Sequence, residues 1–181
     1  MRTLVLTVSL LLVAGMAIAG AGSIGIFADP AGMNCNLPDP GVGLVKYYVV
    51  QVFTTGSTGV AYSAPKPSCF AGTWLSDDNQ FSVFIGTSQT DFLVGYGLCL
   101  AGTVHIQTMN FFTTGVSQSC CKYTVLKSPS EGRIAAVDCD FNYWIPDPAG
   151  GTGTINANPG CTCDVPAQEK TWGQVKSLYA E

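Results

Sequence analysis

Cysteine is the residue type with the most evident chemical role in this 181-residue sequence, because its thiols can form disulfide bonds or bind metal ions. Disulfide bonds and a thiolate-bound metal ion are the two uses that suit so many thiols. Zinc sites usually contain cysteine pairs separated by about two to four residues, and no pair here has that spacing. We therefore expect disulfide bonds, no metal ion and no other cofactor. The eight residues are Cys35, Cys69, Cys99, Cys120, Cys121, Cys139, Cys161 and Cys163.

The sequence restricts the disulfide pairing without fixing it. Cys120 and Cys121 are neighbours, and successive side chains of a strand point to opposite faces, so we expect them to have different partners. Cys161 and Cys163 are also expected to bond separately. We expect Cys139 to lie near Cys120 or Cys121, because a short hairpin would bring their strands together.

Side chains suited to catalysis are few. His105 is the only histidine, and it lies between Val104 and Ile106 in a strand-like pattern, which would place it on one face with Thr103 and Gln107. A Ser-His-Asp device needs that histidine beside a nucleophile and an acid, and no G-x-S-x-G motif is present. We therefore predict a surface or structural histidine in a protein that is not an enzyme.

The carboxylates lead to the same prediction. The closest sets are Asp77-Asp78, Asp138 and Asp140, whereas a glycosidase needs two carboxyl groups across a cleft. Asp77-Asp78-Asn79 lacks the ligand spacing of an EF-hand loop, so we expect a solvated turn there. We assign no catalytic residue, and a secreted hydrolase is the least favoured alternative.

Three aromatic residues are candidates for ligand binding. Trp74, Tyr143 and Trp144 lie near predicted turns, where an exposed ring could stack on a sugar. Tyr47 and Tyr48 lie inside an apolar run and are expected to pack in the core.

An export signal precedes the elements that must position these residues. Arg2 is followed by an apolar stretch, and Ala17-Ile18-Ala19 supplies the small residues that a signal peptidase requires. We predict a signal peptide over residues 1–19, with cleavage after Ala19 or Ala21. An uncleaved membrane anchor is the alternative. The exported chain would be secreted or held in the cell envelope, an oxidising setting, with no membrane contact after cleavage.

Residues 20–166 have the pattern of one all-β domain. β-branched and aromatic residues form runs of strand length, and clusters of Gly, Pro, Asn and Asp separate them at intervals of about ten residues. We predict a disulfide-stapled β-sandwich of the immunoglobulin-like kind. The expected strands are Leu44–Phe53, which should be central, Phe81–Ile85, Asp91–Leu100, Thr103–Phe111, Cys121–Leu126 and Arg133–Phe141.

Residues 167–181 form an amphipathic tail. Trp172, Val175, Leu178 and Tyr179 fall on one stripe of a short helix. A helix of this length is not stable alone, so we expect the stripe to dock, on its own sheet or on a partner, or else to stay frayed.

Charge excludes some partners and favours others. The net charge is −4 at pH 7 and the basic residues are scattered, whereas nucleic acids and anionic membranes require clustered Lys and Arg. We predict a non-catalytic structural, adhesive or interaction protein of the cell surface or extracellular space. A glycan- or small-ligand-binding module is the alternative. The sequence does not identify the partner, and a protein or a glycan at the cell surface fits. An unpaired edge strand would favour assembly with other chains.

Short motifs are spread along the chain: Ser23–Asp29 with Gly32 and Cys35, Tyr96–Cys99, Val137–Cys139, Cys161–Cys163 and Thr171–Tyr179. Together they resemble a group of small, exported, cysteine-rich proteins of environmental bacteria. The resemblance implies an exported, cysteine-rich β protein and assigns no activity, cofactor or partner. Cys69 and one of Cys120 and Cys121 are additional to the pattern of that group, which implies one extra disulfide bond.

Overall fold

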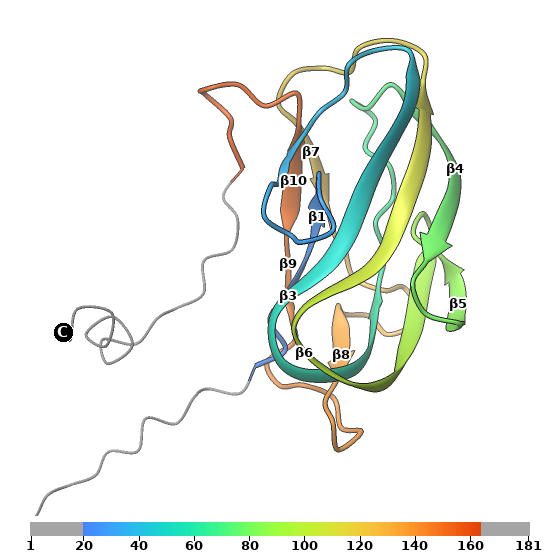
Figure 1. Ribbon diagram of the computed structural model, residues 1–181, viewed down its shortest axis with the longest axis vertical. Helices are drawn as coiled ribbons and strands as arrows, with labels where there is room; N and C mark the ends of the chain where they lie inside the picture. Colours follow the sequence, from blue (N-terminus) through green and yellow to red (C-terminus); the bar gives the residue numbers. More distant parts are fainter. Residues whose placement is uncertain (1–19, 164–181) are drawn as a thin grey trace, which may run out of the picture.

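The computed structural model of the protein describes residues 20–163, which form two packed β-sheets (Figure 1). The strands are β1 Ser23–Phe27, β2 Asn36–Leu37, β3 Gly43–Tyr62, β4 Gly72–Asn79, β5 Val83–Thr87, β6 Asp91–Thr113, β7 Cys121–Thr124, β8 Ala135–Val137, β9 Ala149–Gly150 and β10 Thr152–Ile155. The large sheet has the order β4-β6-β3-β1-β9, with β5 also beside β6 and β8 beside β3. The small sheet has the order β2-β10-β7. The predicted all-β sandwich is confirmed.

Two predicted segments lie outside the described residues. They are the signal peptide over residues 1–19 and the amphipathic helix of the tail, with its stripe of Trp172, Val175, Leu178 and Tyr179. Within residues 20–163, no helix has the length and apolarity that crossing a lipid bilayer requires.

Two long antiparallel strands, β3 and β6, run through the large sheet and divide it into two halves (Figure 1). Residues 43–51 of β3 pair with residues 104–113 of β6, and β4, β1 and β9 complete what we call the five-strand half. Residues 59–62 of β3 pair with residues 92–95 of β6, and β5 and β8 complete the four-strand half. The two halves therefore share their two central strands.

Both long strands bend where the halves meet. The β3–β6 register shifts repeatedly in this stretch, and Phe53, Gly97 and Gly102 have positive φ angles. Glycine adopts such angles at little steric cost, so β6 can change direction without ending. For this reason β6 is one strand, although the sequence pattern presents Asp91–Leu100 and Thr103–Phe111 as two.

Aromatic side chains join the large sheet to the small one. The rings of Tyr47 and Phe111, from β3 and β6, lie 6.4 Å and 6.2 Å from the ring of Tyr123 on β7. Phe70 completes this cluster, 5.0 Å from Phe111, and all four side chains are buried. Burying a side chain of this size contributes about 1.5–3 kcal/mol, so the sandwich has a substantial apolar core besides its disulfide bonds.

All eight cysteines are paired, as Cys35–Cys163, Cys69–Cys121, Cys99–Cys139 and Cys120–Cys161. The predictions that Cys120 and Cys121, and likewise Cys161 and Cys163, have separate partners are confirmed. The expected proximity of Cys139 to Cys120 or Cys121 is wrong. The strand before Cys139 is β8, which pairs with β3 rather than with β7, so the chain leads Cys139 to the bend of β6 at Cys99.

Two local expectations also fail. Asp77 lies in strand β4 rather than in a solvated turn. Its carboxylate accepts hydrogen bonds from the Trp74 indole and from the amide and hydroxyl of Ser88. His105 does not share a face with Gln107, because the register shifts by one residue between Val49 and Val50. The His105 ring instead contacts the side chain of Thr108, at 3.2 Å, while Gln107 is completely buried.

Candidate interaction surface

The outer face of the four-strand half carries two rows of apolar residues. Because side chains alternate between the faces of a strand, the register assigns each row to the side opposite the core residues Tyr62, Phe92 and Val94. One row reads Val83, Gly95, Gly59, Val137 across β5, β6, β3 and β8, and the next reads Ile85, Leu93, Ala61, Ala135. No charged residue occurs in either row.

The first row is hollow in the middle, where two glycines stand side by side. Val83 and Val137 flank Gly95 and Gly59, and we call this depression the apolar trough. A Cβ atom on Gly59 would lie 2.6 Å from the carbonyl oxygen of Val94, so a larger residue fits there only if the backbone shifts. Open cavities of about 270 Å³ and 350 Å³ lie along this face, and Thr58, Val83 and Gly95 line both.

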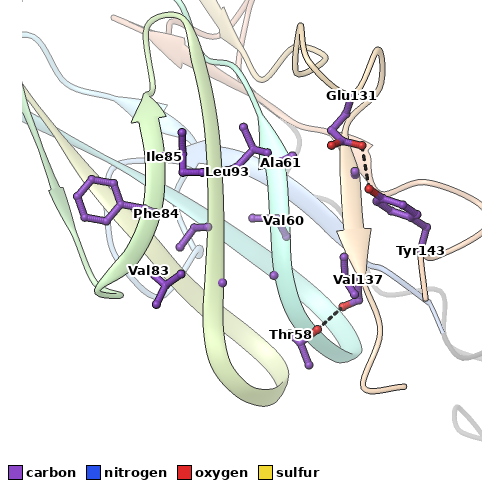
Figure 2. Close-up of a pocket in the computed structure, with 14 residues that line it drawn as sticks. Thr58, Val60, Ala61, Val83, Phe84, Ile85, Leu93, Glu131, Val137 and Tyr143 are labelled. Atoms are coloured by element: carbon purple, nitrogen blue, oxygen red, sulfur yellow. Dashed lines mark hydrogen bonds between the residues drawn. The ribbon is translucent and has the colours of Figure 1, made fainter. Parts of the chain in front are cut away.

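Polar groups lie at the rim of the trough (Figure 2). The Tyr143 hydroxyl donates a hydrogen bond of 3.0 Å to the Glu131 carboxylate. This hydrogen bond and the negative charge of Glu131 raise the pKa of Tyr143. The Arg133 guanidinium lies 4.2 Å from the centre of the Tyr143 ring and is paired with Asp147 at 3.1 Å. Glu131 and Arg133 therefore both contact Tyr143 and hold its ring in place.

A short loop after β8 adds exposed apolar residues beside the trough. Phe141 is 81% exposed at the tip of this loop and has a φ angle of 62°. Together with Leu98, which is 59% exposed, it lines the larger cavity. A left-handed backbone is unfavourable for phenylalanine, so the surrounding structure must hold it there.

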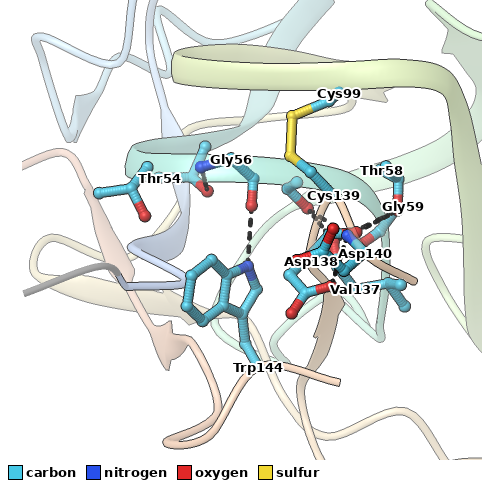
Figure 3. The surroundings of a disulfide bond; sticks show 12 residues. Thr54, Gly56, Thr58, Gly59, Cys99, Val137, Asp138, Cys139, Asp140 and Trp144 are labelled. Carbon is cyan, nitrogen blue, oxygen red and sulfur yellow. Dashed lines mark hydrogen bonds between the residues drawn. A yellow bond between two sulfur atoms is a disulfide. The ribbon is translucent and has the colours of Figure 1, made fainter. Parts of the chain in front are cut away.

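Three contacts fix that loop (Figure 3). The Cys99–Cys139 bond ties it to the bend of β6. The Asp138 carboxylate accepts hydrogen bonds from the amides of Asp140, at 2.9 Å, and Asn142, at 2.8 Å. The Trp144 indole donates a hydrogen bond of 2.8 Å to the carbonyl oxygen of Gly56. The exposed Phe141 side chain therefore projects from a loop held at both ends.

The three predicted binding aromatics are not brought together. Tyr143 lies at the rim of the trough and is about half exposed. Trp144 packs against the core and anchors the loop, and Trp74 packs against the core with its indole bonded to Asp77, 3.0 Å away. Val83, Ile85, Leu98 and Phe141 were not predicted as site residues from the sequence. The signal that points to the first two is the absence of any charged residue from residue 79 to residue 90.

The remaining chemical candidates have structural partners. Burial lowers the pKa of His105, whose ring lies 5.4 Å from that of Tyr48. Asp138 and Asp140 belong to the turn of the Phe141 loop. Within residues 20–163, no group of three or more His, Cys, Asp and Glu side chains is placed to hold a metal ion.

Comparison with known proteins bears on the fold. No family model and no curated protein matches the sequence. A chain of the CaDoc0917–CaCohA2 complex, whose CaCohA2 component is from Clostridium acetobutylicum, is similar with a TM-score of 0.53 and 11% identity, over 75% of this chain and 99% of that one.

Two further solved structures are similar at lower scores. A non-cellulosomal cohesin from the archaeon Archaeoglobus fulgidus has a TM-score of 0.47 and 15% identity, over 74% of this chain and 89% of that one. A cohesin module from a Clostridium perfringens family 33 glycoside hydrolase has a TM-score of 0.48 and 9% identity, over 77% and 99%. At these identities the likeness is one of fold, and the chain is a β-sandwich whose structural neighbours include cohesin modules.

Proposed function

We propose that this chain is a non-catalytic interaction module that binds a partner protein through the outer face of its four-strand half. The observation that carries the proposal is the exposure of uncharged, apolar side chains on that face. Ile85 is 72% exposed and Phe141 is 81% exposed, next to an apolar trough. Contiguous apolar patches on soluble proteins usually mark sites of interaction.

The arrangement of the surface has the features of a protein interface. The centre contains no charge, and the rim carries Glu131, which accepts the hydrogen bond of Tyr143, and Arg133, which pairs with Asp147, as in the core and rim of known interfaces. An apolar side chain of the partner can enter between Val83 and Val137, in the cavity that Gly59 and Gly95 also line. Filling such a site contributes about 1.5–3 kcal/mol.

The loop that carries Phe141 supports binding in a second way. Because the Cys99–Cys139 bond and the Trp144–Gly56 hydrogen bond already hold the loop, little conformational entropy is lost when a partner covers it. Exposed aromatic residues held in this manner are typical of the few residues that dominate binding energy.

The comparisons are consistent with this role. The neighbour with the TM-score of 0.53 is a chain of a complex between two proteins. The four disulfide bonds fit an oxidising compartment, so we place the interaction at the cell surface or outside the cell.

A glycan is the second candidate partner, and the observation that favours it is the Tyr143 ring at the rim of the trough. Sugars stack on open aromatic faces, whereas the Arg133 guanidinium already covers one face of this ring at 4.2 Å. A partner protein therefore fits the surface better.

The test is an affinity capture with the oxidised, full-length exported chain as bait, in extracts of the producing cells and their medium. Four baits are compared: wild type, Leu98→Lys, Phe141→Asn and the control Leu44→Lys. Leu44 is 71% exposed on the five-strand half. Its replacement by lysine therefore shows what adding a charge and removing an exposed apolar side chain does away from the proposed site. Asparagine tolerates the left-handed backbone of position 141, so that variant removes the ring without disturbing the fold.

We expect a defined protein that wild type and Leu44→Lys retain and that Leu98→Lys and Phe141→Asn lose, with at least about a tenfold weaker Kd for the purified pair, about 1.4 kcal/mol. A protein retained equally by all four baits would refute the assignment of the surface. Binding of the wild-type chain to a glycan array, with no protein captured, would replace the proposal with the glycan module.

A further inference from the structure

Strand β5 forms an edge of the large sheet that has neither a charged residue nor, among the described residues, a covering segment. Edge strands expose unpaired amide and carbonyl groups, and proteins normally protect them by shortness, by charged residues or by a covering segment. Among the described residues, β5 pairs with β6 alone. Its sequence is Val-Phe-Ile-Gly-Thr, and no charged residue occurs from residue 79 to residue 90.

The other described edges are all protected. β2 and β9 have two residues each. β4 carries Asp77 and Asp78, and β7 carries Lys122. The free side of β8 is covered by the following loop, since the amide of Trp144 donates to the carbonyl of Ala136 at 2.9 Å. The contrast singles out β5 as the edge that is open to another strand.

We propose that the β5 edge pairs with β5 of a second copy of this chain, antiparallel and about a two-fold axis, so that two large sheets become one. The self-complementarity of the strand points to a second copy as the occupant. Two identical strands without charge meet without like-charge repulsion, and a two-fold axis gives each residue the same environment in both copies.

The backbone selects the register of this pairing. Gly86 has a φ angle of 83° and leaves the extended conformation, so the regular part of the strand is Val83 to Ile85 with Phe84 at its centre. A two-fold axis at Phe84 places Val83 of each copy opposite Ile85 of the other. On the inner side Phe84 meets Phe84 of the second copy. Apolar cross-strand pairs of this kind each contribute about 0.2–1 kcal/mol.

The exposure of Phe84 supports this register. Its ring stacks on the buried ring of Phe92, 6.1 Å away, yet Phe84 remains 44% exposed because no strand lies beyond β5. A second β5 would cover that open side and extend the core across the dimer. Because the paired strands belong to one continuous sheet, the apolar troughs of both copies face the same side, and the dimer presents two sites to one partner surface.

The dimer is tested by its mass, which needs no partner and so is independent of the proposed function. Sedimentation velocity of the oxidised, full-length exported chain is measured over a range of concentrations up to the solubility limit. Three variants are compared with wild type: Phe84→Lys, Phe84→Glu and the control Leu75→Lys, on β4, which pairs with the other stretch of β6, residues 107–113. Circular dichroism verifies that each variant is folded.

We expect wild type and Leu75→Lys to shift from monomer to dimer as the concentration rises, and Phe84→Lys and Phe84→Glu to stay monomeric alone. An equimolar mixture of the two charged variants should form dimers again, because the axis places a lysine opposite a glutamate. If either variant is unfolded, Ile85→Lys, at a more exposed position, replaces it and should also be monomeric. A wild-type chain that is monomeric at every concentration, or charged variants that dimerise alone, would overturn the proposal and leave the partner site unaffected.

Discussion

The two halves of the large sheet share β3 and β6 but differ in what covers their outer faces. On the five-strand half, Phe27, Val50 and Val52 are buried in a second apolar cluster that includes Cys35 of the Cys35–Cys163 bond. On the four-strand half, the equivalent face is an apolar trough that no other segment of residues 20–163 covers. The same two strands thus build a partly covered face in one half and, in the other, the open face that we propose binds a partner.

This difference is a matter of side-chain size and chain connection. The loop between β1 and β2 and the Cys35–Cys163 bond bring a cover to the five-strand half. On the four-strand half the Cys99–Cys139 bond instead holds its loop at the edge of the face, where Phe141 stays in solvent. A disulfide bond can therefore either close a face or hold an exposed residue in position, depending on where its loop leads.

The largest expected effect separates two phenylalanines. Phe111→Ala removes a fully buried ring in contact with Tyr47 and Tyr123 and should lower the free energy of unfolding by about 3–5 kcal/mol. Phe141→Asn removes an exposed ring and should change stability by less than about 0.5 kcal/mol. Urea unfolding measures both. A large loss of stability in Phe141→Asn would show that its side chain belongs to the core.

The next effect separates two disulfide bonds. Replacing Cys99 and Cys139 together by serine should cost about 2–4 kcal/mol of stability and should also weaken partner binding, because the Phe141 loop loses its tie to β6. Replacing Cys69 and Cys121 together is the matched control, since that bond lies away from the trough. It should lower stability by a comparable amount and leave the affinity of the folded protein unchanged. Equal loss of affinity in both double variants would contradict the distinction.

A smaller effect separates the two glycines of the trough. Gly59→Ala would place a methyl group 2.6 Å from the Val94 carbonyl oxygen and should cost about 1–3 kcal/mol. Gly95→Ala would place it 3.7 Å from Val83, an ordinary contact, so stability should stay the same or rise by less than about 1 kcal/mol. Gly95→Ala also narrows the trough and should weaken partner binding. Unchanged affinity in Gly95→Ala would mean that no side chain of the partner enters there.

The smallest effect concerns the five-strand half and its pH response. Burial lowers the pKa of His105 below its ordinary value of 6.5. The imidazole of His105 therefore binds a proton more readily in the unfolded chain than in the folded chain. The contribution of neutral His105 to the free energy of unfolding is complete above pH 6.5 and decreases as the pH drops below that value. Unfolding curves at about pH 5 and pH 8 should differ less for His105→Gln than for wild type. An identical difference in both proteins would remove His105 from the explanation.

The sequence predicted the elements whose pattern is local. Near-continuous apolarity identified β3 as a central strand, and the neighbouring cysteines indicated separate disulfide partners. β4 and β10 were missed, because Asp77-Asp78-Asn79 and the Gly-Thr residues of β10 favour turns in isolation and become strands through their pairing with β6 and β7.

The proposed binding face was harder to predict for a physical reason. Its apolar rows combine residues from β5, β6, β3 and β8, which are far apart in the chain and meet only through the strand register. Tyr143 was identified from its position near a turn. Phe141 and Leu98 resemble core residues by type, and their exposure follows from the bend of β6 and from the Cys99–Cys139 bond.

Hydroxyl-radical footprinting of the chain with and without its captured partner tests the division between the two halves most directly. Exposed apolar reporters exist on both sides: Leu98 and Phe141 beside the trough, and Leu44 and Leu75 on the five-strand half. We predict that the partner lowers the oxidation of Leu98 and Phe141 and leaves that of Leu44 and Leu75 unchanged. Protection of Leu44 and Leu75, with Leu98 and Phe141 still oxidised as in the free chain, would contradict the assignment of the binding face.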